Sequence, residues 1–200
     1  MKTIELYIDE ENEFNGIEAI SVVENPAIEE EFIALNSHEV KLAEVDSEKR
    51  ILMGAALIPN KKIYRSNGEE EYYIFFSEET VRKASELFLS RGKQNNSTLE
   101  HEVQLSGMSV VESWIVEDLE KDKSKKYNLN VPIGTWMVSV KVNNEKVWRE
   151  FVKSGKVKGF SVEGFFADGP KHKAKEGVQE EMAAQEALDI IKKALLNING

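Results

Sequence analysis

The sequence predicts an α+β domain built mainly from antiparallel strands and followed by a helical tail. Short apolar segments recur through the first 167 residues, and turn residues separate them, as expected for strands. Two longer segments instead show the spacing of amphipathic helices. The composition changes after Asp168, where lysine, glycine and proline replace the apolar segments. The strands and the first helix therefore belong to one folded domain.

The N-terminal part begins with a strand. Apolar and polar side chains alternate over residues 4–8, which is the period of a half-buried strand. Asn15 and Gly16 form a turn signal, so residues 17–23 are expected to return as the second strand. The polar segment 36–50 follows, and either a loop or a short helix is compatible with it.

The next part combines two strands with a helix. Residues 51–58 are apolar and stop at a proline, and residues 72–76 are aromatic and β-branched. Ser77 is a favourable N-cap, and the glutamates after it suit the first turn of a helix. Apolar side chains then repeat at helical spacing until Gly92, a suitable C-terminal stop.

The remaining elements are mostly strands. Thr98 to Val103 is a short strand candidate that carries His101, and Ser106-Gly107 is the turn after it. The charged, lysine-rich segment 117–130 is expected to be a loop. We further expect strands at 108–116, 135–142 and 157–166, the last carrying Ser161, and a short helix at 145–153.

Domain boundaries follow from the change in composition. Residues 1–167 are expected to form the folded domain, and residues 168–181 a charged, solvated linker. Apolar residues at helical spacing then predict an amphipathic C-terminal helix over residues 182–200. No internal repeat is present.

Composition excludes several functions. The net charge of −10 and the pI near 5.0 argue against direct nucleic-acid binding, which needs clustered lysine and arginine. The absence of cysteine excludes a cysteine nucleophile, disulfides and thiolate zinc sites. No apolar segment reaches the roughly 20 residues that span a bilayer, and the N-terminus does not look like a signal peptide. We expect a soluble intracellular protein with no cofactor and no metal site.

Two residues could support nucleophilic chemistry. Of the three histidines, His38 and His172 lie in polar segments, whereas His101 lies in a strand context between apolar residues. Ser161 lies in an apolar strand with Gly159 before it and Gly164 after it. From spacing alone, a structural histidine and an incidental serine at a β-bulge are the favoured interpretations. The alternative is a serine nucleophile with His101 as its base.

A third group usually orients such a histidine, and the sequence does not decide which residue would supply it here. Glu112 is the first candidate, because it lies on the strand after His101, across an expected hairpin. Glu163 is two residues from Ser161 and would share its face of the strand. Glu18 is a further candidate. Each of the three carboxylates could equally be a surface charge.

Several stretches together are similar to a known family, the XkdF-type phage serine proteases, a branch of the tailed-phage prohead proteases. They cover most of residues 17–166, in this order: 17–29, 53–60, 98–102, 109–118, 134–138 and 158–166.

The resemblance implies a fold, an activity and partners. The fold is a mostly antiparallel, barrel-like core flanked by helices, as in herpesvirus assemblin, and residues 1–167 would be the protease domain. Ser161 would be the nucleophile and His101 the base of an endopeptidase that cleaves phage scaffolding and major capsid proteins, and itself. Such an enzyme acts in the host cytoplasm, inside the assembling prohead. The terminal helix would bind scaffold, pack on the domain or self-associate as a homo-oligomer.

The chain also departs from the pattern of the wider prohead protease family. Glu163 is inserted before Gly164, in a motif that otherwise continues directly from a small apolar residue to glycine. A segment that normally follows the serine is similar to residues 19–27, which here precede the histidine. This order predicts a circular permutation of the same barrel. The acidic residue of that segment aligns with Ala19, beside Glu18.

Two other functions stay open. The first is a non-enzymatic capsid or scaffold component built on a degenerate protease fold. The second is a hydrolase that uses carboxylates instead of a serine.

Overall fold

A computed structural model describes residues 1–9, 11–26, 33–35, 49–66 and 68–168 of the chain. Its β-strands are Lys2–Tyr7 (β1), Gly16–Val23 (β2), Ile33–Leu35 (β3), Ile51–Leu57 (β4), Ile63–Ser66 (β5), Glu71–Phe76 (β6), Ser97–Leu99 (β7), Val103–Leu105 (β8), Met108–Ile115 (β9), Trp136–Val142 (β10), Gly159–Phe165 (β11) and Ala167–Asp168 (β12). Its helices are Glu78–Ser90 (α1), Lys123–Lys126 (α2) and Glu145–Val147 (α3), with a 3₁₀ turn at Lys93–Asn95 and a π-helical turn at Trp148–Val152.

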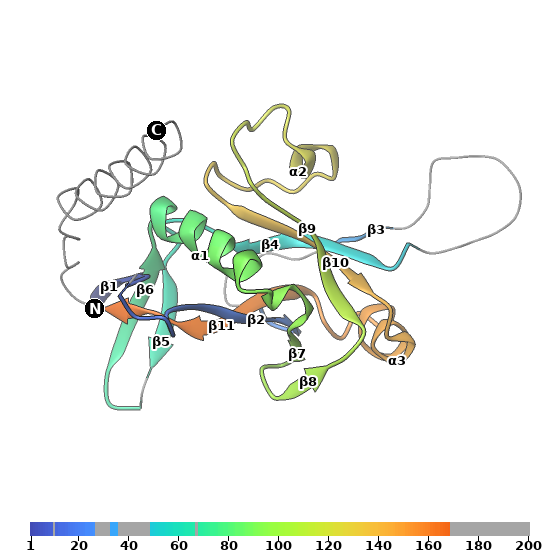
Figure 1. Cartoon of the computed structure of the whole chain (residues 1–200), viewed down its shortest axis with the longest axis horizontal. Helices are drawn as coiled ribbons and strands as arrows, with labels where there is room; N and C mark the ends of the chain where they lie inside the picture. Colours follow the sequence, from blue (N-terminus) through green and yellow to red (C-terminus); the bar gives the residue numbers. More distant parts are fainter. Residues whose placement is uncertain (10, 27–32, 36–48, 67, 169–200) are drawn as a thin grey trace, which may run out of the picture. The chain divides into compact units, whose positions relative to one another are not determined.

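The strands of the described residues form three four-stranded sheets, in the orders β12-β1-β6-β5, β3-β4-β10-β9 and β11-β2-β7-β8. Figure 1 shows the first sheet on the left, the second at the upper right and the third below the second. Among the described strands, only β1–β6 and β2–β7 pair in parallel. The prediction of a mostly antiparallel α+β domain is confirmed. The expectation of a barrel is wrong in one respect, because each sheet has two end strands and none is closed.

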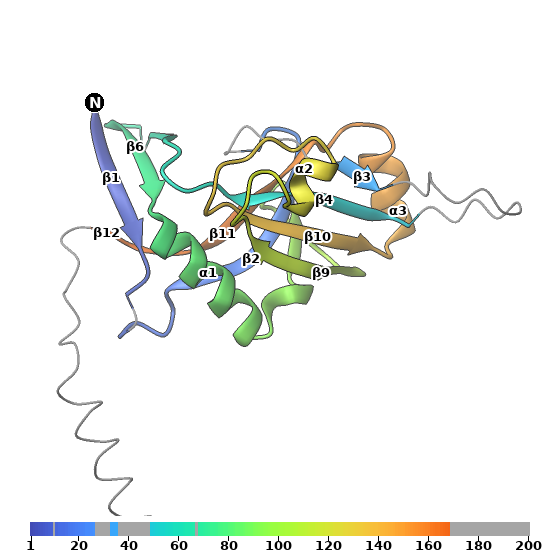
Figure 2. The same ribbon diagram turned by 90° about the horizontal axis from the view of Figure 1, so that it is seen from above.

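Helix α1 begins where the sequence predicted. The Ser77 side chain accepts a hydrogen bond from the Thr80 N–H, and Glu78 and Glu79 lie in the positive first turn. Its buried face, which includes Val81, Ala84 and Phe88, packs beside β2, β9 and β10 (Figure 2). The Phe88 ring meets Trp136 of β10 edge to face, with the ring centroids 5.5 Å apart. This contact ties the helix to the core.

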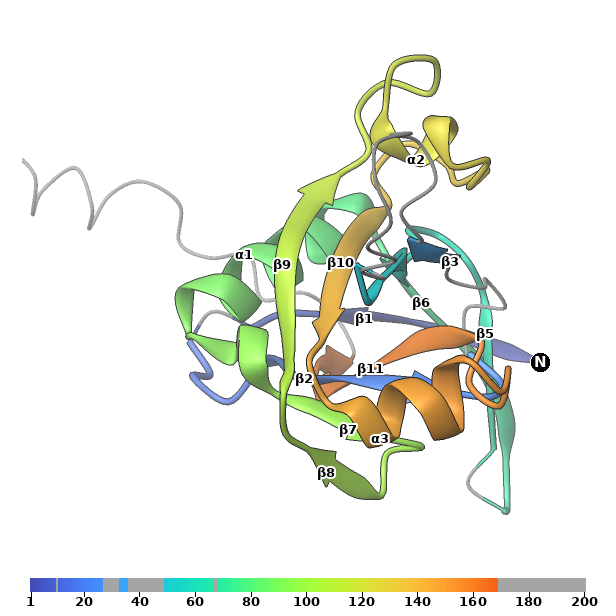
Figure 3. The same cartoon turned by 90° about the vertical axis from the view of Figure 1, so that its right-hand side faces the viewer.

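The sheet β3-β4-β10-β9 contains two almost fully buried strands, β4 and β10. Strand β10 pairs with β4 on one side and β9 on the other, and its apolar side chains lie in the core. Figure 3 shows β9 and β10 running side by side, with the segment that carries α2 at one end and α3 at the other. The predicted helix at 145–153 is present as α3 followed by the π-helical turn. The loop predicted at 117–130 contains the single turn α2.

One predicted pairing and one predicted strand are wrong. The strands around Asn15-Gly16 form but do not make a hairpin, because β1 pairs with β6 and β12, whereas β2 pairs with β11 and β7. The strand expected from Thr98 to Val103 is interrupted, because Glu100 and His101 have φ of 52° and 61°. Two consecutive residues with positive φ make a turn and cannot continue a strand. Strands β3, β5 and β12 were not predicted.

The chain divides into two compact units, residues 1–169 and 170–200. The predicted linker and C-terminal helix lie outside the described residues, as does most of segment 36–50. Within the described residues, no helix has the length and apolar character needed to cross a membrane.

Candidate active site

Ser161 lies on β11, an end strand of its sheet, directly opposite Ser21 of β2. Ser161 is 7% exposed, and the residues of β11 before it are apolar. The register of β11 shifts only after Glu163, so the alternation between Ser161 and Glu163 is intact. Residues two apart on a strand share a face, and these two side chains therefore point to the same side of the sheet.

His101 lies in the turn between β7 and β8, in the same sheet as Ser161. The Glu102 N–H donates to the Leu99 carbonyl at 3.0 Å, which closes a turn around Glu100 and His101. Both central residues have positive φ, as in a type I′ turn, although neither is glycine or asparagine. Such a conformation costs free energy, and strain of this kind is concentrated at functional sites.

Three hydrogen bonds to the end of β2 hold this turn in place. The Glu100 N–H donates to the Val22 carbonyl at 3.2 Å, and the Glu24 N–H donates to the Glu100 carboxylate at 2.6 Å. The His101 N–H donates to the Ser21 hydroxyl oxygen at 3.1 Å. Ser21 is fully buried, and its own hydroxyl donates to the Thr98 carbonyl at 3.4 Å. The histidine backbone is thus fixed to the residue that faces Ser161.

The His101 ring is paired with Glu163. Its Nδ1 lies 3.0 Å from Glu163 Oε1, and the same oxygen accepts a hydrogen bond from the Thr98 hydroxyl. A carboxylate can only accept, so Nδ1 carries the proton in this pair. The other ring nitrogen, Nε2, is then the basic one. The imidazole is 42% exposed and the carboxylate 29%, so a substrate can reach this pair.

The structure therefore brings Ser161, Glu163 and His101 together on one sheet, from one strand and one turn. Glu163 joins the other two, because it shares the face of Ser161 and contacts the His101 ring. Within the described residues, no hydrogen bond links the Ser161 hydroxyl directly to His101. The arrangement resembles a nucleophile, base and orienting acid, in which the acid holds one imidazole nitrogen and leaves the other for a proton.

Glu112 lies elsewhere. It is on β9, in the sheet that contains β10, and its carboxylate is 2.5 Å from the Lys123 ammonium. This ammonium lowers the pKa of Glu112 below its ordinary value. The hairpin expected to bring Glu112 to His101 is absent, because the strand after His101 is β8, which pairs with β7. Glu18 pairs with Lys93.

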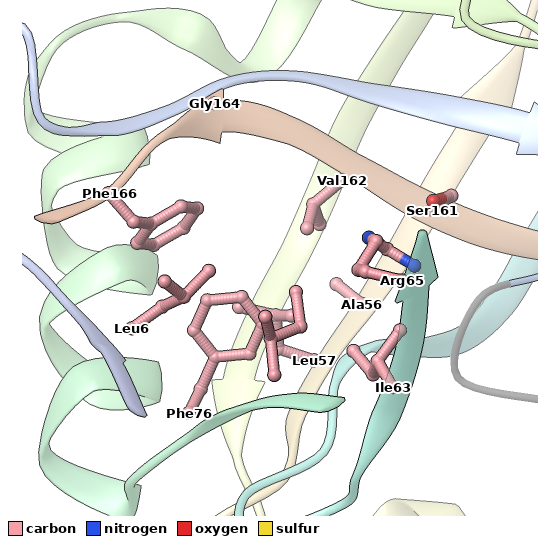
Figure 4. A pocket seen from close by; sticks show the side chains of 11 residues that line it. Leu6, Ala56, Leu57, Ile63, Arg65, Phe76, Ser161, Val162, Gly164 and Phe166 are labelled. Carbon is pink, nitrogen blue, oxygen red and sulfur yellow. The ribbon is translucent and has the colours of Figure 1, made fainter. Parts of the chain in front are cut away.

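A cavity of about 210 Å³ adjoins Ser161 (Figure 4). It is lined by residues of β1, β4, β5, β6 and β11, and its wall includes Ser161 and Val162. Leu6, Phe76 and Phe166 close one end with apolar side chains, and Arg65 lies at the other end near Ser161. Within the described residues, no group of three or more acidic or histidine side chains could hold a metal ion.

Sequence reasoning missed the two residues that position the pair, Ser21 and Thr98. Both lie in stretches that carry the family resemblance, but neither has a charged or unusual side chain to mark it. Their roles depend on the β2–β7 pairing, which puts Thr98 beside Ser21 in parallel register.

Comparison with known proteins supports the resemblance. A family model described as "Putative phage serine protease XkdF" matches residues 39–168. This range holds 130 of the 200 residues and includes both His101 and Ser161. No curated protein and no solved structure matches the chain significantly.

Proposed function

Because this chain belongs to the phage serine protease family named after XkdF, we propose that it is the prohead maturation endopeptidase of a tailed phage. In this proposal Ser161 is the nucleophile, His101 the general base and Glu163 the acid that orients the histidine. The observation that carries the assignment is the 3.0 Å contact between His101 Nδ1 and Glu163, two residues from Ser161 on the same strand face.

The proposed reaction follows from these positions. Ser161 Oγ attacks a peptide carbonyl, and its proton passes to Nε2 of His101. The Glu163 carboxylate stabilises the imidazolium that forms, without taking its proton. The histidine then protonates the leaving amine, and water hydrolyses the acyl-enzyme. In this proposal the Ser161 hydroxyl and His101 Nε2 come within hydrogen-bonding distance of each other when substrate binds.

Glu163, rather than Glu112, is the acid in this proposal for a second reason. The resemblance aligns the acidic residue of the wider family with Ala19, which cannot supply a carboxylate. Ala19 lies directly opposite Glu163 across the β2–β11 pair. Glu163, the residue inserted into β11, therefore supplies a carboxylate directly across from Ala19, the position at which the wider family has its acidic residue. The register shift that follows Glu163 accommodates the insertion.

The partners and location are part of the same proposal. The substrates would be the scaffolding and major capsid proteins of the phage, and the chain itself. The enzyme would act in the host cytoplasm, inside the assembling prohead. Residues 182–200 would bind scaffold or associate with a second copy. The core would be a circularly permuted relative of the assemblin-like protease fold, which agrees with the predominance of antiparallel strands.

Co-expression with the cognate scaffolding protein tests this function. The wild-type chain should shorten the scaffold, and Ser161→Ala and His101→Ala should leave it intact. Ser154→Ala is the matched control, because its hydroxyl is exposed and, among the residues that the structure describes, bonds only to the nearby Glu150 and Phe151 carbonyls. Cleavage that persists in Ser161→Ala would contradict the proposal and favour a carboxylate hydrolase.

The same experiment addresses the non-enzymatic alternative. A structural capsid or scaffold component would support head assembly equally well with Ser161→Ala, and scaffold processing would be unchanged. The family membership and the ordered His101–Glu163 pair favour the enzyme.

A further inference from the structure

We propose that the cavity beside Ser161 is the specificity pocket of the enzyme. It would bind an apolar side chain of the substrate, while Arg65 binds an acidic side chain close to it. This inference rests on the proposed protease function and names the substrate class: extended peptides in which an apolar residue lies near Asp or Glu.

The size of the cavity suits one side chain. Its volume of about 210 Å³ is below the roughly 300–1,000 Å³ of pockets that hold whole drug-sized ligands. Apolar side chains from five strands meet in it: Leu6 of β1, Leu57 of β4, Ile63 of β5, Phe76 of β6 and Val162 of β11. All are apolar, so a bound leucine or phenylalanine side chain would leave water for an apolar wall.

The position of the cavity relates it to the reaction. Ser161 and Val162 both line it, although the Val162 side chain points to the face of β11 opposite the Ser161 and Glu163 side chains. Figure 4 shows Ser161 at the end of the cavity where Arg65 lies. Because β11 is an end strand, a peptide along its edge can place one side chain in the cavity while a neighbouring peptide bond lies near Ser161. Binding of that side chain would hold the peptide against the nucleophile.

Arg65 is the cationic group of this cavity. It lies on the edge strand β5, is exposed, and donates through Nη1 to the Tyr64 carbonyl at 2.9 Å. That bond uses one of the five N–H donors of the guanidinium, whose fork geometry matches a carboxylate. Arg65 also lines a second hollow of about 710 Å³, together with Lys2, Ile4 and Tyr72. It thus stands where a peptide would leave the apolar cavity.

Carboxylates also line the second hollow, at Glu70, Glu71 and Asp168. They would repel an acidic side chain and attract a basic one. Arg65 lines both the apolar cavity and the second hollow, whereas these three carboxylates line only the second hollow. The acidic residue of the substrate is therefore expected beside the apolar residue, and preference for lysine at that position is the opposing outcome of the test.

Binding to the full-length Ser161→Ala variant tests the pocket without cleavage. The probes are fluorescein-labelled, capped octapeptides with a central leucine and with Glu, Gln or Lys at a neighbouring position, measured by anisotropy. Replacing the leucine by serine should weaken binding about tenfold, because the apolar burial is lost. Replacing Glu by Gln should weaken it about threefold to tenfold, and Lys should bind worst.

Charge reversal identifies the residue responsible. Arg65→Glu, combined with Ser161→Ala, should reverse the order so that the lysine peptide binds better than the glutamate peptide. Arg82→Glu is the matched control: it is an exposed arginine on α1, outside both hollows, and should leave the order unchanged. As a second variant, Ala56→Val fills the cavity wall and should remove the preference for leucine over serine.

Two results would overturn the inference: equal binding of the leucine and serine peptides, or a glutamate preference that survives Arg65→Glu. Neither result depends on peptide-bond cleavage. Scaffold that is processed by the wild-type chain, together with such a result, would leave the protease function standing and reject only the pocket. Selective peptide binding without any processing would reject the protease function and leave a peptide-binding site.

Discussion

Ser21 and Ser161 lie directly opposite each other on β2 and β11, and the Ser21 hydroxyl also accepts the hydrogen bond from the His101 N–H. One buried side chain therefore links the backbone of the proposed base directly to the residue that faces the proposed nucleophile. Ser21 is the residue of β2 whose side chain bonds to the turn that carries His101. The geometry of this turn depends on a serine that takes no part in the chemistry.

We predict that Ser21→Ala weakens both the fold and the activity. The substitution leaves the His101 N–H without its acceptor, which costs about 1–3 kcal/mol of stability. It also releases the turn, so kcat should fall more than KM changes. Urea unfolding and peptide cleavage assays measure the two effects.

Ser97→Ala is the control for this prediction. Ser97 is a buried serine of the same sheet, but its hydroxyl has no hydrogen-bond partner within the described residues. Its removal should be close to neutral for stability and activity. Equal effects of the two substitutions would contradict a positioning role for Ser21.

We predict that Glu163→Gln lowers kcat about a hundredfold or more, whereas Glu112→Gln leaves it nearly unchanged. An amide in place of the Glu163 carboxylate no longer stabilises the imidazolium and can favour the wrong tautomer of His101. Glu112 pairs with Lys123 on another sheet. Steady-state cleavage of one peptide by both variants is the measurement. A large loss in Glu112→Gln alone would reverse the assignment.

We predict that Gly164→Ala destabilises the domain by several kcal/mol, of the order of the most severe single substitutions. A Cβ at this position would lie 2.1 Å from the Gly16 carbonyl oxygen, and the backbone of β2 would have to move. This is the point where the register shifts after Glu163. Gly155→Ala is the control, because it has open space and only the penalty of φ 70°, about 1 kcal/mol. Thermal unfolding of the two variants should separate them clearly.

We predict a small, pH-dependent contribution from the Glu112–Lys123 pair. The pKa of Glu112 is lowered in the folded chain, so the pair stabilises the fold above the ordinary glutamate pKa of 4.5. The contribution disappears as the pH falls through the lowered folded pKa. The side chains are 46% and 35% exposed, so solvent screening keeps it below about 1 kcal/mol.

Urea unfolding of the wild type and Lys123→Gln measures this contribution. The difference in unfolding free energy should be present at about pH 7 and vanish by about pH 2, where the carboxylate is protonated in both states. A difference that grows on acidification would have the wrong sign for this ion pair.

Local signals in the sequence were enough for most of the elements. Ser77 and the glutamates after it predict the start of α1, and the apolar segments predict β4, β6, β9, β10 and β11. The family was also recognisable, because its stretches keep their residues in order along the chain. Ser161 and His101 could be selected as candidates from their contexts, although spacing alone favoured a structural explanation for both.

Strand pairing could not be predicted, because it depends on contacts between residues far apart in the chain. The parallel pairing of β2 with β7 brings Ser21 to Thr98, and the antiparallel pairing with β11 brings it to Ser161. Alternation along one strand says which side chains share a face but not which strand lies next to it. For the same reason the expected Glu112–His101 hairpin looked reasonable and did not form.

The sequence by itself determined the class of the domain, its family and the two residues for which chemistry was worth testing. Only the tertiary structure decided which carboxylate meets His101, because the sequence placed Glu112 ahead of Glu163 and Glu18, whereas Glu163 is the one that contacts the His101 ring. The identity of a side chain is local information, whereas the distance between an imidazole and a carboxylate depends on how whole strands pack.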